Sequence, residues 1–277
     1  MEFRKNPVRL IINADDFGRS RPINEAVIRA HREGVLTTTS LMVNESDCNE
    51  AVQMAKQNPR LGVGLHLAVV CGKSALPHAR IPGLTNEAGE FSDNAVSSGM
   101  RFFFNRDLEK ELFEEINMQF KKFQATGLVL DHVNGHLNTH LHPTIFRILM
   151  HNAERWGIRH MRLTYDDFWL NARLASGSWM YRASHAFIYR MLSAQSRPIL
   201  AAKKIKHTER VFGLLQNARV DEAFIAKLLP ELPAGDSELY SHPSLDEFKY
   251  EFEALISPKV KDSIQKLGIQ LIRYQDL

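Results

Sequence analysis

The sequence has very little cysteine, no long apolar run and almost no excess of charge of either sign. Cys48 and Cys71 are the only cysteines in 277 residues, too few and too far apart for a disulfide framework or a paired-cysteine metal site, which favours a reducing compartment. No stretch reaches the roughly 18 apolar residues of a membrane-spanning helix, and the first residues lack the apolar centre of a signal peptide. We therefore expect a cytoplasmic protein.

The composition is that of an ordinary globular chain. Apolar residues make up 44% and charged residues 24% of the sequence, which argues against disordered and fibrous proteins. The formal net charge of +3 is small for this length, so the overall charge gives no support for a nucleic-acid partner. We expect one domain over residues 1–277.

Strand-like and helix-like segments alternate along the chain, which predicts parallel βα units. Two irregular regions, at about 72–105 and 164–207, interrupt the alternation as insertions. About seven repeats by this interpretation predict an α/β fold, an irregular (β/α) barrel of seven strands. The predicted strands are residues 8–15, 37–44, 61–70, 128–133, 158–163, 237–242 and 269–274, and the predicted helices are residues 20–34, 45–59, 107–126, 143–156, 220–229, 246–256 and 258–267.

Four of the predicted strands end in residues that bind metals or transfer protons. Asp15 and Asp16 end the first strand, His66 lies in the third, and His136 and His242 lie at or just after two later strands. In a barrel of parallel strands these ends meet on one face, where active sites are found. One Asp and two His from three strands form an open three-ligand set, and an ion held there lowers the pKa of water and polarises a carbonyl group.

The adjacent carboxylates of Asp15 and Asp16 suggest a division of roles. Neighbours in sequence point in different directions, so one can face a metal ion while the other accepts a proton. Amide hydrolysis needs both a general base and a general acid, because the amine leaves only when it is protonated. His242 is placed to be that acid.

Each of these motifs also has an ordinary structural explanation. An Asp pair at a strand end commonly caps a helix or forms a turn, and a histidine in a strand is more often hydrogen bonded in the core than a ligand. His132, His136 and His140 would share one face of a helix, whereas Asn134 and Gly135 favour a strand end followed by a loop. The functional interpretation rests on all the motifs falling at matching strand ends.

Four motifs spread over the whole chain, ADDFG, GLHL, HLHP and SHP, together resemble the YdjC-like carbohydrate deacetylases. The segment LDHVNGH, with RFFF and FGLL, resembles the hopanoid biosynthesis-associated HpnK branch of that family. The resemblance implies a barrel related to polysaccharide deacetylases and a metal-dependent removal of an N-acetyl group from an amino sugar. It implies Asp16, His66 and His136 as metal ligands, Asp15 as general base and His242 as general acid.

The segment after the fourth predicted strand departs from the family pattern. Asn134 stands where a carboxylate is common, and Leu137 and Asn138 replace polar or imidazole groups. His136 and His140 are retained, so we expect a working site with fewer groups supporting the ligands. We expect His132, Asn134 and His140 to contact substrate, with a structural role as the alternative for His132.

The resemblance to the narrower branch implies N-acetylglucosaminyl bacteriohopanetetrol as the substrate. The alternatives are a deacetylase of soluble chitooligosaccharides and a catalytically weak protein that binds an amino-sugar lipid. The ligand set suits Zn²⁺, and also Mn²⁺, Co²⁺ or Fe²⁺, whereas Mg²⁺ prefers oxygen ligands but is often assigned to this family. The identity of the metal and the oligomeric state, including a homo-oligomer, stay open at this point.

Residues 162–206 form a basic segment with interleaved aromatic residues. It holds eight Lys or Arg against two Asp, and if 179–193 is helical, apolar and polar residues fall on different faces. Such a helix can lie on an anionic membrane surface. The alternative is an ordinary helix that covers the barrel with a solvated face. A contact between residues 162–206 and the inner face of the membrane is therefore a further expectation.

Overall fold

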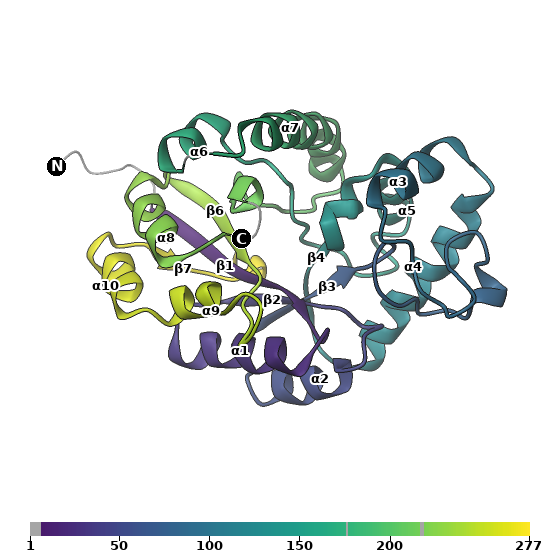
Figure 1. Ribbon diagram of the computed structural model, residues 1–277, viewed down its shortest axis with the longest axis horizontal. Helices are drawn as coiled ribbons and strands as arrows, with labels where there is room; N and C mark the ends of the chain where they lie inside the picture. The colour runs from purple at the N-terminus through teal and green to yellow at the C-terminus, as the bar shows by residue number, and fades with distance from the viewer. Residues whose placement is uncertain (1–6, 176, 217–218) are drawn as a thin grey trace.

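A parallel β-sheet of seven strands forms the centre of the structure (Figure 1). The computed structural model describes residues 7–175, 177–216 and 219–277. Six strands follow one another in the order β4-β3-β2-β1-β6-β5, and β7 pairs with the beginning of β1. The strands are β1 (Val8–Phe17), β2 (Thr38–Leu41), β3 (Gly62–Leu67), β4 (Leu130–Gly135), β5 (Arg210–Phe212), β6 (Gly235–Ser241) and β7 (Gln270–Leu271). The predicted α/β fold with parallel strands is confirmed.

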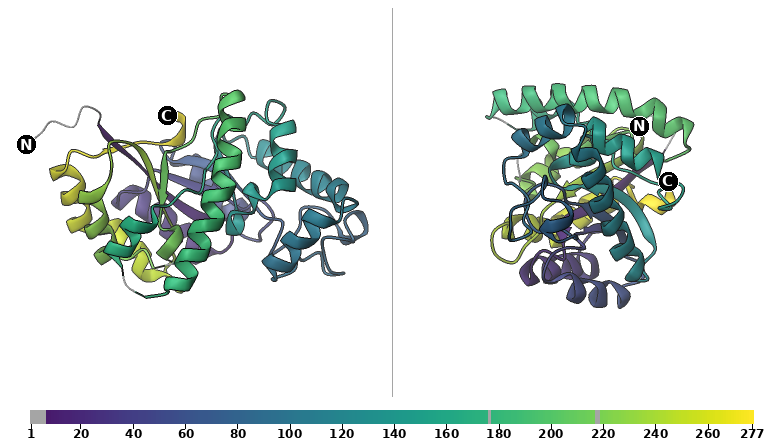
Figure 2. Two further views of the ribbon diagram at one scale, coloured as in Figure 1. Left: turned by 90° about the horizontal axis from the view of Figure 1, so that it is seen from above. Right: turned by 90° about the vertical axis from the view of Figure 1, so that its right-hand side faces the viewer.

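Helices surround the curved sheet (Figures 1 and 2). Among the described residues, no helix is long and apolar enough to span a membrane. The helices are α1 (Arg21–Glu33), α2 (Cys48–Lys56), α3 (Ala95–Phe104), α4 (Leu108–Ala125), α5 (Pro143–His151), α6 (Phe168–Leu174), α7 (Trp179–Ala202), α8 (Glu222–Leu228), α9 (Lys249–Ile256) and α10 (Pro258–Lys266), with short 3-10 helices η1 (His78–Arg80), η2 (His136–Leu141), η3 (Leu214–Gln216), η4 (Leu229–Glu231) and η5 (Tyr274–Asp276).

The prediction of a strand at 158–163 is wrong. This segment makes only isolated bridges, Val133 with Met161 on one side and His160 with Lys206 on the other. It nevertheless fills the gap between β4 and β5, because its backbone bonds to β4 through the Arg162 N–H and to the chain before β5. One bridge on each side is too few for a regular ladder, so the barrel is completed by an irregular connection instead of by a strand.

Other differences from the prediction lie in short elements and in the two expected insertions. Strand β5 has only three residues and was not predicted, and the last strand is shorter than expected because the chain turns into η5. The region 72–105 contains α3, whose first turn is capped by the Asn94 side chain accepting from the Ser97 N–H. The region 164–207 contains α6 and α7.

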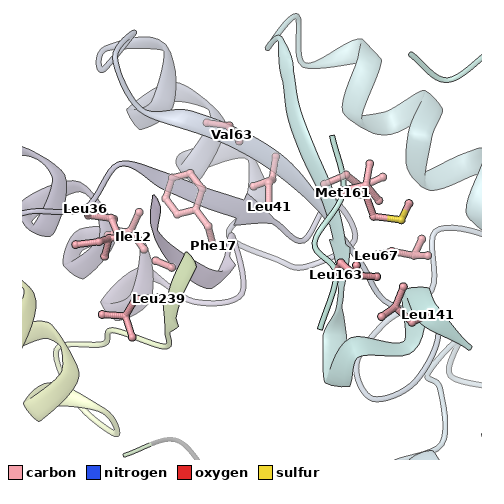
Figure 3. Packing of buried hydrophobic residues seen from close by; sticks show 14 of the residues in the cluster. Ile12, Phe17, Leu36, Leu41, Val63, Leu67, Leu141, Met161, Leu163 and Leu239 are labelled. Carbon is pink, nitrogen blue, oxygen red and sulfur yellow. The ribbon is translucent and has the colours of Figure 1, made fainter. Parts of the chain in front are cut away.

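The apolar core lies between the sheet and the helices (Figure 3). Strand β1 shows why these strands are apolar along most of their length: Leu10, Ile11 and Ile12 are all fully buried, as expected where both faces of a parallel sheet are covered. Each such side chain contributes about 1.5–3 kcal/mol when removed from water. The core holds the strands rigidly, and their carboxyl ends therefore hold the polar residues described next in fixed positions.

Candidate metal centre

The backbone at the end of β1 separates the two adjacent carboxylates. Asp16 adopts a left-handed conformation with φ of 65°, which is unfavourable for a residue other than glycine. The register of β1 against β2 shifts between Ala14 and Phe17, as in a β-bulge. Because of this turn, Asp15 contacts Arg162 inside the barrel, whereas Asp16 contacts His66 and His136.

Asp16, His66 and His136 form a compact cluster of potential metal ligands. Asp16 Oδ1 lies 3.2 Å from His66 Nε2 and 3.1 Å from His136 Nδ1, and one ligand atom from each residue lies within 4.8 Å of the others. The three come from β1, β3 and the first residue after β4. The structure therefore brings together the three predicted ligands from widely separated parts of the chain.

The charges of this cluster favour a bound cation. Burial alone would lower the pKa of His136, but the hydrogen bond and negative charge of Asp16, together with a hydrogen bond to Cys71, outweigh burial and raise that pKa to about 10. The buried carboxylate thus draws positive charge to the position between the rings. A divalent ion would supply that charge and displace the proton, and one carboxylate oxygen with two imidazole nitrogens is a donor set that such ions accept.

Asn134 orients the ring of His66 through a hydrogen bond. Asn134 Oδ1 lies 2.7 Å from His66 Nδ1, and the Asn134 amide donates to Asp15 Oδ1 at 3.0 Å and to Ser40 Oγ at 3.1 Å. With the amide oriented this way, His66 Nδ1 is the protonated nitrogen and Nε2 presents its lone pair toward Asp16. Asn134 therefore orients a predicted ligand, the function that a carboxylate often has beside metal-binding histidines.

Asp15 is a buried carboxylate, 3% exposed, that is surrounded by donors. Burial by itself would raise the pKa of Asp15, but the charge and hydrogen bonding of Arg162, together with the nearby His66 and His242, outweigh burial and leave the pKa well below the ordinary value. Asp15 Oδ2 accepts from Arg162 Nη1 at 2.7 Å. Asp15 Oδ1 accepts four hydrogen bonds, from Asn13 Nδ2 at 2.8 Å, Ser40 Oγ at 2.8 Å, Asn134 Nδ2 at 3.0 Å and Arg162 Nη2 at 2.9 Å.

Arg162 is fully buried and pairs with two carboxylates. Besides Asp15 it binds Glu238, with Nε and Nη2 at 3.0 and 2.7 Å from Oε1, and its guanidinium lies 4.9 Å from the centre of the Tyr240 ring. Arg162 itself is therefore not available for the membrane contact that was expected of residues 162–206. An unpaired cation cannot be buried without a large cost, so its position is fixed by these two acids.

His242 follows β6 at the same end of the sheet. Its backbone N–H donates to Glu251 Oε2 at 2.5 Å, and its half-buried ring contacts the rings of Tyr240 and Phe248, with centroid separations of 5.2 and 6.1 Å. The register of β1 against β6 pairs Ala14 with Ser241, so Asp15 and His242 are the next residues of the two neighbouring segments. The predicted acid and the predicted base thus share one end of the barrel.

The three residues predicted to contact substrate are all buried. His132 stacks on Tyr274, with ring centroids 4.3 Å apart, and its Nδ1 lies 2.9 Å from Asp131. The His140 ring nitrogen Nε2 lies 3.0 Å from the Arg162 carbonyl oxygen. These contacts fit a structural role for His132 and supporting roles for His140 and Asn134, and a direct contact with substrate stays a prediction for all three.

Sequence reasoning did not identify Arg162, Ser40 or Asn13 as part of this network. Ser40 and Asn13 stand in predicted strands without a motif, so their types and spacing carry no signal. Arg162 did not stand out either, because the predicted strand IRHMRL also contains Arg159 and His160. A buried guanidinium among apolar residues needs acidic partners, and Asp15 and Glu238 supply them from strands far away in sequence.

Arg182 belongs to the basic segment 162–206 that was expected to contact a membrane, but it does not face outward. Its side chain is 5% exposed and donates to the carbonyl oxygens of Leu215 and Ala175, at 3.2 and 2.5 Å. Ser193, on the same face of α7, donates to the Thr164 carbonyl oxygen. The face of α7 that carries Arg182 and Ser193 therefore packs against the barrel.

The sequence matches the model of one protein family and has several relatives among known proteins. The sequence model of a family described as YdjC-like protein matches residues 9–266. A carbohydrate deacetylase of Clostridium beijerinckii is 30% identical over 98% of this chain and 100% of its own length, and a chitooligosaccharide deacetylase of Yersinia enterocolitica is 30% identical over 96% and 98%. A carbohydrate deacetylase of Brevibacillus brevis is 38% identical over 54% of this chain, which spans only 58% of that relative.

Solved structures show the same fold. A protein of Enterococcus faecalis V583 with a proposed role in cellobiose-phosphate cleavage has a TM-score of 0.73 at 23% identity, covering 98% of each chain. An uncharacterized protein of Agrobacterium tumefaciens C58 has a TM-score of 0.56 at 13% identity, covering 97% of this chain and 88% of that one. At such low sequence identities, the similarity shows only that these proteins share the fold.

Proposed function

Because the chain belongs to the YdjC-like proteins, we propose that it removes the N-acetyl group from an amino sugar by metal-dependent hydrolysis. The observation that carries the proposal is the meeting of Asp16, His66 and His136 within 4.8 Å, at the barrel end that also holds Asp15 and His242. The names of the two nearly full-length relatives, a carbohydrate deacetylase and a chitooligosaccharide deacetylase, support the substrate class.

Asp16, His66 and His136 would hold the metal ion. Bound there, a divalent ion would polarise the acetamide carbonyl group and make water a stronger acid. Two nitrogen ligands favour Zn²⁺, Mn²⁺, Co²⁺ or Fe²⁺ over Mg²⁺, which prefers oxygen ligands. The bond from Asn134 to His66 Nδ1 keeps the other ring nitrogen available for this role.

Asp15 is the proposed general base, and its two oxygens differ. Asp15 Oδ1 already accepts four hydrogen bonds, whereas Oδ2 accepts one, from Arg162 Nη1. Oδ2 is therefore the oxygen with capacity to accept a proton from the attacking water. The lowered pKa of Asp15 keeps it ionised at neutral pH, as a base must be, although it also limits how strongly it attracts the proton.

His242 is the proposed general acid, giving its proton to the amine nitrogen as the carbon–nitrogen bond breaks. The bond from its backbone N–H to the fully buried Glu251 fixes the start of the loop that carries the ring. Glu251 is in turn held by the Val220 N–H at 3.0 Å. The ring is half-buried, so it is accessible from the barrel end and fixed by its aromatic neighbours.

For the substrate we propose a lipid-linked N-acetylglucosamine, N-acetylglucosaminyl bacteriohopanetetrol. The support is the resemblance of LDHVNGH, RFFF and FGLL to the hopanoid-associated branch, together with the apolar Leu137. That residue directly follows the proposed ligand His136 and is 55% exposed, in a left-handed conformation with φ of 50°. A soluble chitooligosaccharide is the second candidate, and the name of the Yersinia enterocolitica relative favours it.

The test is acetate release from the glycolipid and from diacetylchitobiose, each after chelation and after return of Zn²⁺, Mn²⁺ or Mg²⁺. Metal-restored release from the glycolipid alone supports the lipid substrate, and release from both supports a general amino-sugar deacetylase. No release from either substrate, with metal bound at the site, would contradict the proposed activity and leave the amino-sugar binding protein as the better description.

Variants separate the two proton-transfer roles. Replacing His242 by Gln should slow hydrolysis of the acetamide by about 100-fold or more, because the amine must leave protonated. The same variant should hydrolyse an aryl acetate ester nearly as fast as the parent protein, since a phenolate leaves without that proton. Replacing Asp15 by Asn should slow both reactions while metal stays bound. Equal losses for both substrates in the His242 variant would remove its assignment as the acid.

A further inference from the structure

Helix α7 is oriented with its apolar residues outward. Three of its four buried residues are polar, namely Arg182, Ser193 and Ser196, and the fourth is Leu200. In contrast, Met180 is 88% exposed and Phe187 is 65% exposed. Helices on the surface of a globular protein normally bury the apolar side and expose the polar side. The remaining large apolar residues of this helix with substantial exposure are Trp179, Ile188, Met191 and Ile199.

The polar inner face is fixed to the barrel, so this orientation is not arbitrary. Arg182 and Ser193 donate to backbone carbonyl groups below the helix, and Tyr189 OH accepts from the Asn138 amide at 3.4 Å. The helix packs against η2 and η3, which follow the carboxyl ends of β4 and β5. Figure 2 shows α7 along one edge of the molecule, with none of the described elements lying outside it.

The outward face of α7 also carries positive charge without acidic neighbours in sequence. No Asp or Glu occurs between Asp167 and Glu209. Arg190 and Arg197 are exposed, and no ion pair among the described residues involves either of them. Two turns of helix separate them, so they flank the same side of the apolar residues.

We propose that the outward face of α7, formed by Met180, Phe187, Ile188, Met191, Arg190 and Arg197, docks on an anionic lipid bilayer. Apolar side chains enter the region below the headgroups, and the arginines pair with lipid phosphates. The charge pattern favours this occupant over a second copy of the chain, because α7 itself carries no carboxylate that could pair with Arg190 or Arg197 of another copy.

Trp169 and Arg190 extend this surface toward α6. They line a cavity of about 310 Å³ between α6 and α7, together with Phe168, Phe187 and the acidic residues Asp166 and Asp167. Trp169 is 78% exposed, and tryptophan favours the boundary between lipid and water. At the edge of the proposed docking face, the cavity thus joins aromatic side chains to one arginine on its α7 side and to two acidic residues on the side that precedes α6. The inference stands on this surface alone and does not depend on the proposed reaction.

The experiment is co-sedimentation of the full chain with vesicles of phosphatidylglycerol and phosphatidylcholine, compared with phosphatidylcholine alone. We expect binding to the anionic vesicles that weakens as salt is added. Replacing Met180 and Phe187 together by Ser should weaken binding by about tenfold or more, because two large apolar groups no longer enter the lipid. Replacing Arg190 and Arg197 by Gln should remove the preference for anionic vesicles.

The matched control replaces Val129 and Leu267 by Ser. They are 78% and 45% exposed and lie near the amino ends of β4 and β7, away from the barrel end that α7 covers. This variant should bind vesicles like the parent chain. Circular dichroism and turnover of a soluble amino sugar should be the same for the α7 and control variants, which separates lipid binding from folding and from the proposed reaction.

Two outcomes would overturn the proposal. One is equal vesicle binding by the α7 and control variants. The other is an absence of vesicle binding together with a dimer, seen by analytical ultracentrifugation, that the Met180 and Phe187 replacements dissociate. That second result would assign the surface to a contact between two copies of the chain.

Discussion

The Arg162 guanidinium donates to both carboxylate oxygens of Asp15, at 2.7 and 2.9 Å, across 147 positions of sequence. The same guanidinium binds Glu238, and all three side chains are nearly or completely excluded from water. A planar guanidinium matches a carboxylate with two parallel bonds, which lysine cannot do. This pair fixes the orientation of the proposed base and holds the irregular segment 159–165 against β1 and β6.

Replacing Arg162 by Met should destabilise the protein by about 3–5 kcal/mol, because Asp15 and Glu238 would remain buried without their cation. Urea unfolding gives this difference directly. The matched control is Arg173→Met, which removes an exposed pair with Glu231 at 3.2 Å and should cost about 1 kcal/mol or less. A similar small cost for both variants would mean that the buried network is not needed for stability.

Replacing Asn134 by Leu should weaken metal binding by about 10- to 100-fold. Leucine has nearly the same size, but it cannot accept from His66 Nδ1, so the ring is free to rotate or to move its proton to the ligand nitrogen. Titration with Zn²⁺ against a competing chelator measures the change. Unaltered affinity in a folded Asn134→Leu protein would show that the His66 ring is held by other contacts.

Added Zn²⁺ or Mn²⁺ should raise the thermal midpoint of the chelated protein, because a ligand that binds only the folded state stabilises it. At a free metal concentration about 100 times the dissociation constant, the gain is about 2.7 kcal/mol. In His66→Ala the shift should disappear, since one of the three ligands is missing. A shift that persists in this variant would place the stabilising ion elsewhere on the protein.

His140 should make the stability depend on pH below neutrality. Burial lowers its pKa from 6.5 to about 3, so between these values the unfolded chain binds a proton that the folded chain does not. The contribution of His140 to the free energy of unfolding is therefore fully present above about pH 6.5 and is lost as the pH falls toward 3. Between these values the free energy of unfolding decreases by at most about 1.4 kcal/mol per pH unit because of this group.

The test of that pH dependence is urea unfolding of the parent protein and of His140→Gln between pH 7.5 and 5.5. Glutamine can still donate to the Arg162 carbonyl oxygen, as the His140 ring does, but it does not titrate. The variant should lose less stability than the parent over this interval. If the free energy of unfolding decreases equally with pH in the two proteins, other histidines must cause the loss of stability in acid.

The residue pattern by itself determined the main features of the fold and of the proposed metal centre. Apolar runs alternating with amphipathic segments predict parallel strands, and parallel strands bring their carboxyl ends to one face of the sheet. Asp16, His66 and His136 therefore could be placed together from their positions after apolar runs. Local periodicity is a property of short segments, so it can be recognised in a single sequence.

Only the tertiary structure decided what surrounds these residues. Arg162 and Arg182 look like surface cations in the sequence, but distant acids and carbonyl groups hold them inside. The hydrogen bond from Asn134 to His66 could not be foreseen either, because the two residues are 68 positions apart in sequence. Helix α7 exposes its apolar side because its polar side bonds to the barrel. Such partners are set by contacts between remote segments, and no local pattern of residue types encodes them.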